Sequence, residues 1–239
     1  MNRILFETQA ESYRLASGDP RLAHARGVLR AKVGDVLDVG VVNGPAGKGK
    51  VVELNSDALT LSVEWGATPD TLPPIHLLVG MSRPQTMRRI LQEAATLGVA
   101  ALHIASASRS DPAYRQSRLW KDEQWRSYLI AGAEQAFDTR IPELHLHDDL
   151  NAALKSLPEP ATRIALDVYA EAKAWSLFSE ESPAVVLAIG PERGWTCPEQ
   201  QWFKDQSFQS IRLSDRVLRV ETAVVAALTL VQDRLGLLG

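Results

Sequence analysis

The sequence predicts two folded parts, a small barrel-like β domain followed by a larger α/β domain with a parallel sheet. Before residue 67, short alternating or β-branched runs are separated by Gly, Asn and Asp, which is typical of a small barrel. Residues 67–74, ATPDTLPP, contain three prolines and no apolar periodicity, so they predict a linker. After them, near-continuous apolar strands alternate with helices, as in a parallel sheet covered on both faces.

The first domain, expected over residues 1–69, should hold four strands and one helix. Asp19-Pro20 supplies an N-cap followed by a first-turn proline, so the helix is expected to start there and to run to about Lys32. Gly34-Asp35 then turns the chain into the next strand. The strands are expected at RILFE, VLDVGVV, KVVEL and ALTLSVEW, which are residues 3–7, 36–42, 50–54 and 58–65.

The second domain, expected over residues 75–239, alternates strands and helices. The segment 83–98 carries apolar residues at helical spacing, and a longer helical segment covers 118–139. The last helix, 221–235, is apolar on most faces, which predicts packing in a core or an interface. Strands are expected at residues 75–81, 99–105, 143–147, 162–168, 184–190 and 210–214.

The composition narrows the class of protein. The 239 residues include one cysteine, Cys197, which excludes a disulfide framework and a cysteine-based zinc ribbon. The N-terminus lacks the apolar run of a signal peptide, and no stretch of about 18 apolar residues occurs. A cytoplasmic location is therefore expected.

The net charge of −3 argues against a nucleic-acid ligand, but its distribution changes that conclusion. Residues 21–50 hold six basic and two acidic side chains, and residues 83–126 hold eight basic and four acidic side chains. Residues 141–199 hold four basic and ten acidic side chains and offset both. A net acidic protein can thus carry a basic face, although solvated helix faces explain the same charges equally well.

Two tempting motifs lack the context that their chemistry needs. GPAGKGKV, Gly44 to Val51, matches a phosphate-binding loop except that Val51 replaces the Ser or Thr, and the strand-like VVELN follows instead of a helix. It is better explained as a glycine-rich hairpin loop that carries two lysines. His145 and His147 lie on one face of a strand, but no third ligand is near and the other histidines are scattered, so no metal site is expected.

Two loops that follow apolar strands carry the strongest functional signal. In AVVLAIGPERGWTCPEQQWF a strand ends at Gly190, a loop runs to Gly194, and Thr196-x-x-Glu199 then forms a capping box with Pro198 in the first turn. Parallel sheets bind ligands at such carboxyl ends. IRLSDRVLRVETAVVAALTL repeats the arrangement further along the chain. The pattern alone also fits ordinary connections between strands and helices.

The sequences of these loops resemble the RsmE family of ribosomal RNA methyltransferases, a branch of the SPOUT class. The family pattern is close to G-P-E-G-G-[FW]-[ST]-x-x-E followed by L-G-x-R-I-L-R-x-E-T-A, and this chain has GPERGWTCPE and LSDRVLRVETA. Three residues depart from the family: Arg193 and Ser214 replace glycines, and Thr96 replaces a glutamate. A left-handed backbone at either former glycine would cost about 1 kcal/mol or more. Further agreement lies at His24…Val28-Leu29-Arg30…Gly34-Asp35, Ala95-Thr96-Leu97-Gly98-Val99 and Ala133-Glu134-Gln135…Arg140-Ile141-Pro142.

The resemblance implies a SPOUT-type parallel sheet tied in a trefoil knot, preceded by a PUA-like β-barrel that helps to bind RNA. It implies a homodimeric enzyme that transfers a methyl group from S-adenosylmethionine to N3 of a uridine in 16S ribosomal RNA. Arg26, Arg30, Lys48 and Lys50 are the expected phosphate contacts of the barrel. Two other functions stay open: a ribosome-assembly factor that binds RNA without catalysis, and a SPOUT methyltransferase with another RNA target.

The resemblance also assigns the two loops to the cofactor. Glu192 or Glu221 is the expected base for the N3 proton, and Arg219, with Arg216 as the weaker alternative, is expected to stabilise the developing charge. An ion pair at the start of the last helix explains Arg219 and Glu221 nearly as well. The expected cofactor-binding residues are Ile189, Gly190, Pro191, Glu192, Gly194, Leu213, Ser214, Val217, Leu218 and Arg219.

Overall fold

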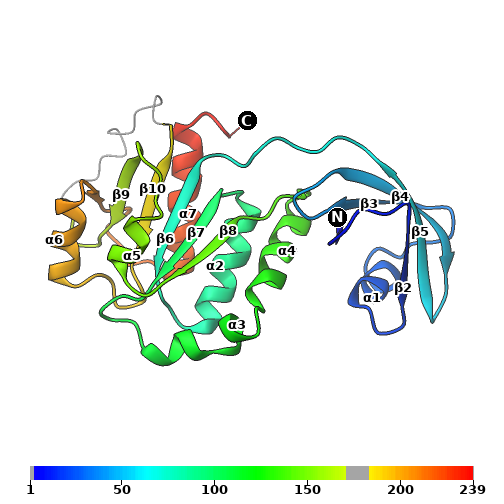
Figure 1. Ribbon diagram of the computed structural model, residues 1–239, viewed down its shortest axis with the longest axis horizontal. Helices are drawn as coiled ribbons and strands as arrows, with labels where there is room; N and C mark the ends of the chain where they lie inside the picture. The colour runs from blue at the N-terminus through cyan, green and yellow to red at the C-terminus, as the bar shows by residue number, and fades with distance from the viewer. Residues whose placement is uncertain (1–2, 171–182, 239) are drawn as a thin grey trace. The chain divides into compact units, whose positions relative to one another are not determined.

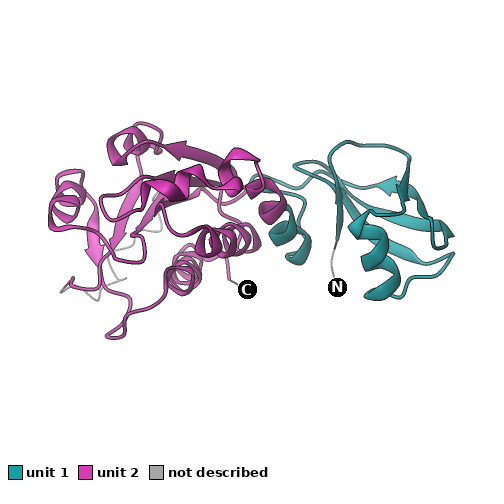
Figure 2. Ribbon diagram, turned by 90° about the horizontal axis from the view of Figure 1, so that it is seen from below, with its two compact units in different colours: residues 1–71, 130–141 teal, residues 72–129, 142–239 magenta. Residues whose placement is uncertain are grey.

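The computed structural model describes residues 3–170 and 183–238. The chain divides into two compact units, each built around its own sheet. The first unit comprises residues 1–71 and 130–141, and the second comprises residues 72–129 and 142–239 (Figure 2).

The first unit holds a curled five-stranded sheet and the helix α1 (Pro20–Gly27). The strands are β1 (Ile4–Phe6), β2 (Ser12–Ala16), β3 (Val36–Val41), β4 (Ala46–Leu54) and β5 (Ala58–Trp65) (Figure 1). Their order is β1-β3-β4-β5-β2, and all pairs are antiparallel except β1 with β3. Leu15, Leu22, Val39 and Leu61 belong to the apolar cluster that this sheet and helix enclose.

Two local predictions for this unit are wrong. Helix α1 starts at the predicted N-cap, Asp19, but it ends at Gly27 instead of continuing to Lys32. Glycine disfavours a helix, and Arg30 has a φ of 51°, which a right-handed helix cannot contain. The strand β2 was not predicted, because its alternation is limited to two inward residues, Tyr13 and Leu15, of which only Leu15 is buried.

The glycine-rich segment 44–51 forms part of a strand. β4 includes both Lys48 and Lys50, so the prediction that a loop carries these lysines is wrong. Gly47 lets β4 lie close to β5, since a Cβ there would be 2.6 Å from the carbonyl oxygen of Glu64. A strand instead of a helix follows the glycines, which agrees with the rejection of an NTPase loop.

The second unit is built on a six-stranded sheet whose paired strands are all parallel, as predicted. The strands are β6 (Ile75–Gly80), β7 (Ala101–Ala105), β8 (Glu143–His147), β9 (Thr162–Leu166), β10 (Val185–Ile189) and β11 (Gln209–Ile211). Their order is β11-β9-β10-β6-β7-β8. Every residue of β7 and β10 is buried, so both faces of the sheet are covered.

The helices that follow β6 in the chain are α2 (Pro84–Thr96), α3 (Arg118–Lys121), α4 (Trp125–Gln135), α5 (Leu150–Leu154), α6 (Cys197–Asp205) and α7 (Val220–Arg234), with a 3-10 turn, η1 (Pro112–Gln116). Of these, α5, α6 and α7 contact strands of the sheet, and residues 130–135 of α4 belong to the first unit. Ala153 of α5 and Phe203 of α6 share an apolar cluster with Leu78 and Ala188 of the sheet. α7 packs against α2 and β10, as its apolar sequence predicts (Figure 1). Within the described residues, no helix is long and apolar enough to cross a membrane.

The helix predicted over residues 118–139 is interrupted. α3 ends at Lys121 and α4 begins at Trp125, because Glu123 between them has a φ of 52°. Phe137, with a φ of 61°, lies beyond the end of α4 and also cannot belong to a right-handed helix. Apolar periodicity does not reveal such single left-handed residues.

Candidate functional site

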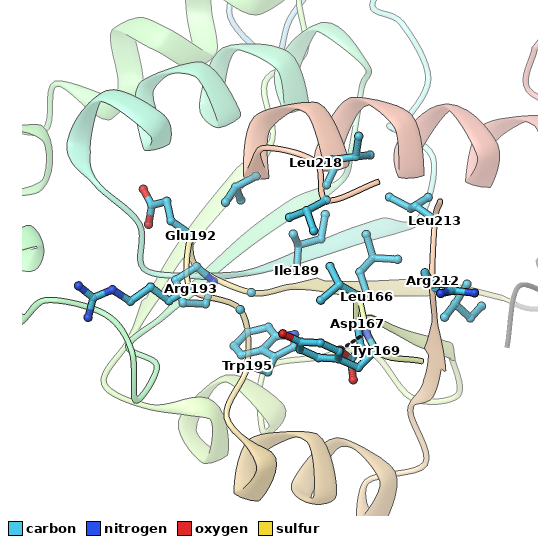
Figure 3. Close-up of a pocket in the computed structure, with 18 of the residues that line it drawn as sticks. Leu166, Asp167, Tyr169, Ile189, Glu192, Arg193, Trp195, Arg212, Leu213 and Leu218 are labelled. Atoms are coloured by element: carbon cyan, nitrogen blue, oxygen red, sulfur yellow. Dashed lines mark hydrogen bonds between the residues drawn. The ribbon is translucent and has the colours of Figure 1, made fainter. Parts of the chain in front are cut away.

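The carboxyl ends of β9, β10 and β11 border a cavity of about 300 Å³. Most of its lining comes from these strand ends and from the loops that follow them. The side chains of Leu166, Ile189, Leu213 and Leu218 converge there (Figure 3). Apolar walls that meet the backbone of two loops suit an organic ligand with a few polar groups.

Glycines hold the loop after β10 in one shape. Gly194 has a φ of 67°, and its amide donates to the carbonyl oxygen of Pro191 (2.7 Å), which closes a tight turn. A Cβ on Gly190 would lie 3.1 Å from the Cα of Gly194 and from the amide nitrogen of Trp195. A Cβ on Gly80 of β6 would lie 2.5 Å from the Cδ of Pro191. The loop can therefore lie directly against the ends of the strands.

The predicted capping box is present at the start of α6. The Thr196 hydroxyl accepts from the amide of Glu199 (3.4 Å), and the Glu199 carboxylate accepts from the amide of Thr196 (2.7 Å). The same carboxylate accepts from the amide of Ser108 (2.8 Å), which ties the loop after β7 to α6. Burial acts to raise the pKa of Glu199, but these amide hydrogen bonds outweigh it and hold the pKa below its ordinary value. Glu199 is thus an ionised structural group.

Arg193 and Ser214 stand where the resembled family has glycines, yet neither has a positive φ. The Ser214 hydroxyl accepts from the amide of Arg216 (3.1 Å) and donates to its carbonyl oxygen (2.8 Å). The strain that a missing glycine would cause therefore does not arise at either position.

The residues predicted to bind a cofactor line this cavity, apart from Arg219. Those that line it are Ile189, Gly190, Pro191, Glu192, Gly194, Leu213, Ser214, Val217 and Leu218. Arg219 is the exposed N-cap residue of α7, and its side chain makes no capping hydrogen bond. Arg216, the alternative charged residue, does line the cavity.

Only one of the two carboxylates predicted as bases lines the cavity. Glu192 does, and its Oε1 accepts from the amide of Arg83 (3.0 Å). Glu221 lies outside the lining, in the first turn of α7, where it pairs with Arg89 (3.0 Å). An ion pair therefore exists at the start of α7, but its basic partner is Arg89 and not Arg219.

Sequence reasoning missed one wall of the cavity. Leu166, Asp167 and Tyr169 line it at the end of β9, and Asp167 Oδ1 accepts from the amide of Tyr169 (2.9 Å). β9 was itself predicted, so the preference of ligands for carboxyl ends would have located this wall. Trp195 also lines the cavity; it is 5% exposed, and its enclosed Nε1 has no hydrogen-bond partner among the described residues.

Four histidines come together elsewhere on the sheet, so the prediction that the remaining histidines are scattered is wrong for His76 and His103. His76 of β6, His103 of β7, and His145 and His147 of β8 form stacked pairs, and we call them the histidine array. His103 Nε2 lies 3.2 Å from His76 Nδ1, and His103 Nδ1 lies 3.2 Å from His147 Nε2. Both nitrogens of His103 are thus used inside the array. In the described part of the chain, no group of three or more side chains has the arrangement of a metal site.

The four basic residues predicted to contact RNA all lie exposed in the first unit. Arg26 is on α1, Arg30 follows that helix, and Lys48 and Lys50 are on β4. Lys48 is paired with Asp38 (2.7 Å), and this exposed pair contributes little to stability.

Comparisons with known proteins point to one group. Residues 69–232 match the model of a family described as RNA methyltransferase domain. Ribosomal RNA small subunit methyltransferase E of Treponema pallidum is 28% identical over 97% of this chain and 90% of that protein. Ribosomal RNA small subunit methyltransferase E 1 of Borreliella burgdorferi is 24% identical over 98% of this chain and 99% of that protein.

Solved structures show the same fold over the whole chain. The ribosomal RNA small subunit methyltransferase E of Neisseria gonorrhoeae, bound to S-adenosylmethionine, gives a TM-score of 0.80 at 24% identity, covering 98% of this chain and 97% of that one. A methyltransferase structure from Legionella pneumophila with bound SAM gives a TM-score of 0.81 at 25% identity, and the match covers 97% of this chain and 96% of that one.

Proposed function

The chain belongs to the RNA methyltransferase domain family, and from this membership we propose that it methylates small-subunit ribosomal RNA with S-adenosylmethionine. The full-length relatives carry that activity in their names, and the Neisseria and Legionella structures contain that methyl donor. The observation that carries the proposal is the cavity at the ends of β9, β10 and β11, because its loops are those whose sequences match the family.

The lining suits S-adenosylmethionine, which supplies an electrophilic methyl group when it is bound. Leu166, Ile189 and Leu218 offer apolar surface for an adenine ring. The Asp167 carboxylate offers an acceptor for hydroxyl or ammonium groups. This ligand carries no phosphate, in keeping with the absence of a phosphate-binding motif from the sequence.

We assign N3 of a uridine in 16S ribosomal RNA as the acceptor. A bond forms from N3 to the methyl carbon while the bond from that carbon to sulfur breaks, and N3 gives up its proton. Glu192 is the proposed base, because it lines the cavity and its side chain is oriented by the amide of Arg83. Arg216 now becomes the preferred residue to stabilise charge that develops on the uracil oxygens, because it lines the cavity, and Arg219 at the α7 N-cap becomes the alternative.

The proposal also covers the two domains and their roles. We assign residues 1–69 to a PUA-like barrel that binds RNA through Arg26, Arg30, Lys48 and Lys50, and residues 75–239 to the catalytic domain. β10 lies between β6 and β9, which both precede it in the chain, and this order is compatible with the trefoil knot that the family resemblance implies. A ribosomal RNA substrate would place the activity in the cytoplasm.

A homodimer is also proposed. Leu230 on α7 and Leu237 and Leu238 beyond it are 37%, 46% and 48% exposed, and this apolar surface favours a second copy of the chain as its cover. Sedimentation equilibrium of the purified protein at micromolar concentration should give twice the chain mass of 26.2 kDa. A single-chain mass would remove the dimer from the proposal.

Deleting the gene and mapping N3-methyluridine in 16S ribosomal RNA tests the function directly. One mark should disappear, and the purified protein with S-adenosylmethionine should restore it on small subunits from the deletion strain. An unchanged map would refute the proposed reaction. Calorimetric titration with S-adenosylmethionine separates the alternatives: no binding with retained RNA binding indicates an assembly factor, and binding with an unchanged map indicates another RNA target.

A further inference from the structure

A second cavity, of about 390 Å³, adjoins the first one and is lined mainly by polar residues. It is lined by Arg83, Ser108, Arg109, Ser110, Asp111, Tyr114, Glu192 and Arg193. The two cavities share Arg109, Glu192 and Arg193, so the loop after β10 forms a wall of both. We call this second space the arginine cavity.

Three guanidinium groups border the arginine cavity, and none of them forms an ion pair with another described residue. Arg83 Nε donates to the hydroxyl of Tyr114 (3.3 Å), and Arg109 Nη1 donates to the carbonyl oxygen of Arg193 (2.5 Å). No described residue forms a hydrogen bond or an ion pair with the Arg193 guanidinium. In Figure 3 this side chain extends away from the apolar residues of the first cavity.

The two carboxylates of the arginine cavity already have backbone partners. Asp111 accepts from the amide of Ala113 (2.9 Å) at the start of η1, and Glu192 accepts from the amide of Arg83 (3.0 Å). Glu192 attracts Arg83, but three guanidinium groups outnumber the two carboxylates, so the arginine cavity keeps a net positive charge that favours an anion between the guanidinium groups. Guanidinium groups bind phosphate oxygens through paired hydrogen bonds.

We infer that the arginine cavity binds a backbone phosphate of the RNA beside the target nucleotide, with Arg193 and Arg83 as its phosphate contacts. This inference rests on the proposed function, and it assigns Arg193, which replaces a family glycine, a role in substrate binding. Arg83 and Tyr114 lie outside the lining of the first cavity. The anion would therefore lie outside the first cavity and beside Glu192, which lines both cavities.

The test compares Arg193→Gln with Arg234→Gln, which removes the same charge from the exposed last turn of α7. Binding of fluorescently labelled protein to small subunits from the deletion strain is measured between 50 and 200 mM KCl at constant magnesium. Arg193→Gln should weaken binding about tenfold at low salt, and the slope of log K against log salt should fall by about one. Arg234→Gln should behave as wild type, and Arg193→Lys should keep the wild-type slope because it keeps the charge.

Three results would overturn the inference. Arg193→Gln could keep the wild-type slope and affinity for the subunits. It could instead lose affinity for S-adenosylmethionine in calorimetry while the slope stays unchanged, which would identify the anion as the carboxylate of the cofactor. Wild-type protein could also fail to bind the subunits at all, and then both proposals fail.

Methyl transfer by the wild-type protein separates the two proposals. If it methylates the subunits and Arg193→Gln shows no change in slope, the function stands and the phosphate site is wrong. If it transfers no methyl group but the slope falls as expected, the phosphate site stands and the proposed reaction is wrong. In the supporting case, Arg193→Gln raises KM for subunits and leaves kcat near the wild-type value, because a phosphate contact made equally before and during the reaction affects binding alone.

Discussion

The histidine array makes the stability of the second unit depend on pH. Burial, together with repulsion from His145, His76 and His147, lowers the pKa of His103 to about 3. Burial also lowers the pKa of His76 and of His147. Repulsion from His145 and Arg115 lowers the pKa of His147 further, and the nearby Asp148 opposes this effect. His103 is 1% exposed, and both of its nitrogens face neighbouring imidazoles, so a proton can be added only at the expense of these contacts.

The sign and size of the effect follow from linkage. His103 has a depressed pKa in the folded state, so the unfolded chain binds its proton first as pH falls below 6.5. A group with a pKa of 6.5 when unfolded and about 3 when folded destabilises the folded state by about 2 kcal/mol at pH 5, compared with pH 8. His76 and His147 act in the same direction, so the value for His103 is a share of the total.

His103→Gln tests this value, because glutamine keeps a donor and an acceptor but does not titrate in this range. Urea unfolding is followed by tryptophan fluorescence, since Trp120, Trp195 and Trp202 lie in the same unit as His103. Between pH 8 and pH 5, wild type should lose about 2 kcal/mol more unfolding free energy than His103→Gln. His24→Gln, which lies outside the array in the first unit, should keep the wild-type loss.

Equal losses in wild type and His103→Gln would refute the reasoning. A second readout does not depend on how the variant folds: the imidazole proton resonance of His103 in the wild-type protein should stay fixed between pH 8 and pH 5. A titration of that resonance near pH 6.5 would show that the array does not exclude the proton.

Three further predictions concern the first cavity, at the carboxyl ends of β9, β10 and β11, and the loop beside it. Glu192→Gln should lower methyl transfer at least about 100-fold while affinity for S-adenosylmethionine in calorimetry stays within about twofold, and normal turnover would remove Glu192 as the base. Gly190→Ala should weaken that affinity at least about tenfold, since the new Cβ would lie 3.1 Å from loop backbone, whereas Gly27→Ala meets no atom within 4 Å and should bind normally. Glu199→Gln should lower the free energy of unfolding in urea by about 1 kcal/mol at pH 7. Because the pKa of this carboxylate is lowered in the folded state, the difference between wild type and variant should shrink as pH falls below 4.5. A difference that does not depend on pH would contradict this prediction.

The regular elements follow from local patterns, and the errors occur where single backbone residues decide. The central strands β6, β7 and β10 are apolar runs that are almost wholly buried, and a parallel sheet covered on both faces accounts for them. Helix α1 ends early at Gly27, and the helix expected over 118–139 breaks at Glu123. In both cases the chain keeps a helical composition across the interruption, so periodicity gives no warning.

The candidate site divides in the same way. The loop residues around Gly190 and Leu213 were located because motif and strand end coincide there. Trp195 belongs to the same motif, but its unpartnered indole nitrogen is a property of the packed structure. The histidine array was missed because it depends on register: His103 pairs with His145, and neighbouring strands bring His76 and His147 beside them. Sequence spacing carries no information about which residues of separate parallel strands lie opposite each other.

The loop after β10 explains how the chain can depart from its family without damage to the fold. Gly190 is fixed by close contact and Gly194 by a left-handed φ, so a side chain at either position would disturb the turn that borders the first cavity. Arg193, between them, has no positive φ, and its side chain can therefore extend into the arginine cavity without backbone strain. Gly190 and Gly194 are thus required by the backbone, whereas the position of Arg193 between them accepts a side chain. A charged side chain at this one position lines both cavities and leaves intact the turn that Gly190 and Gly194 fix.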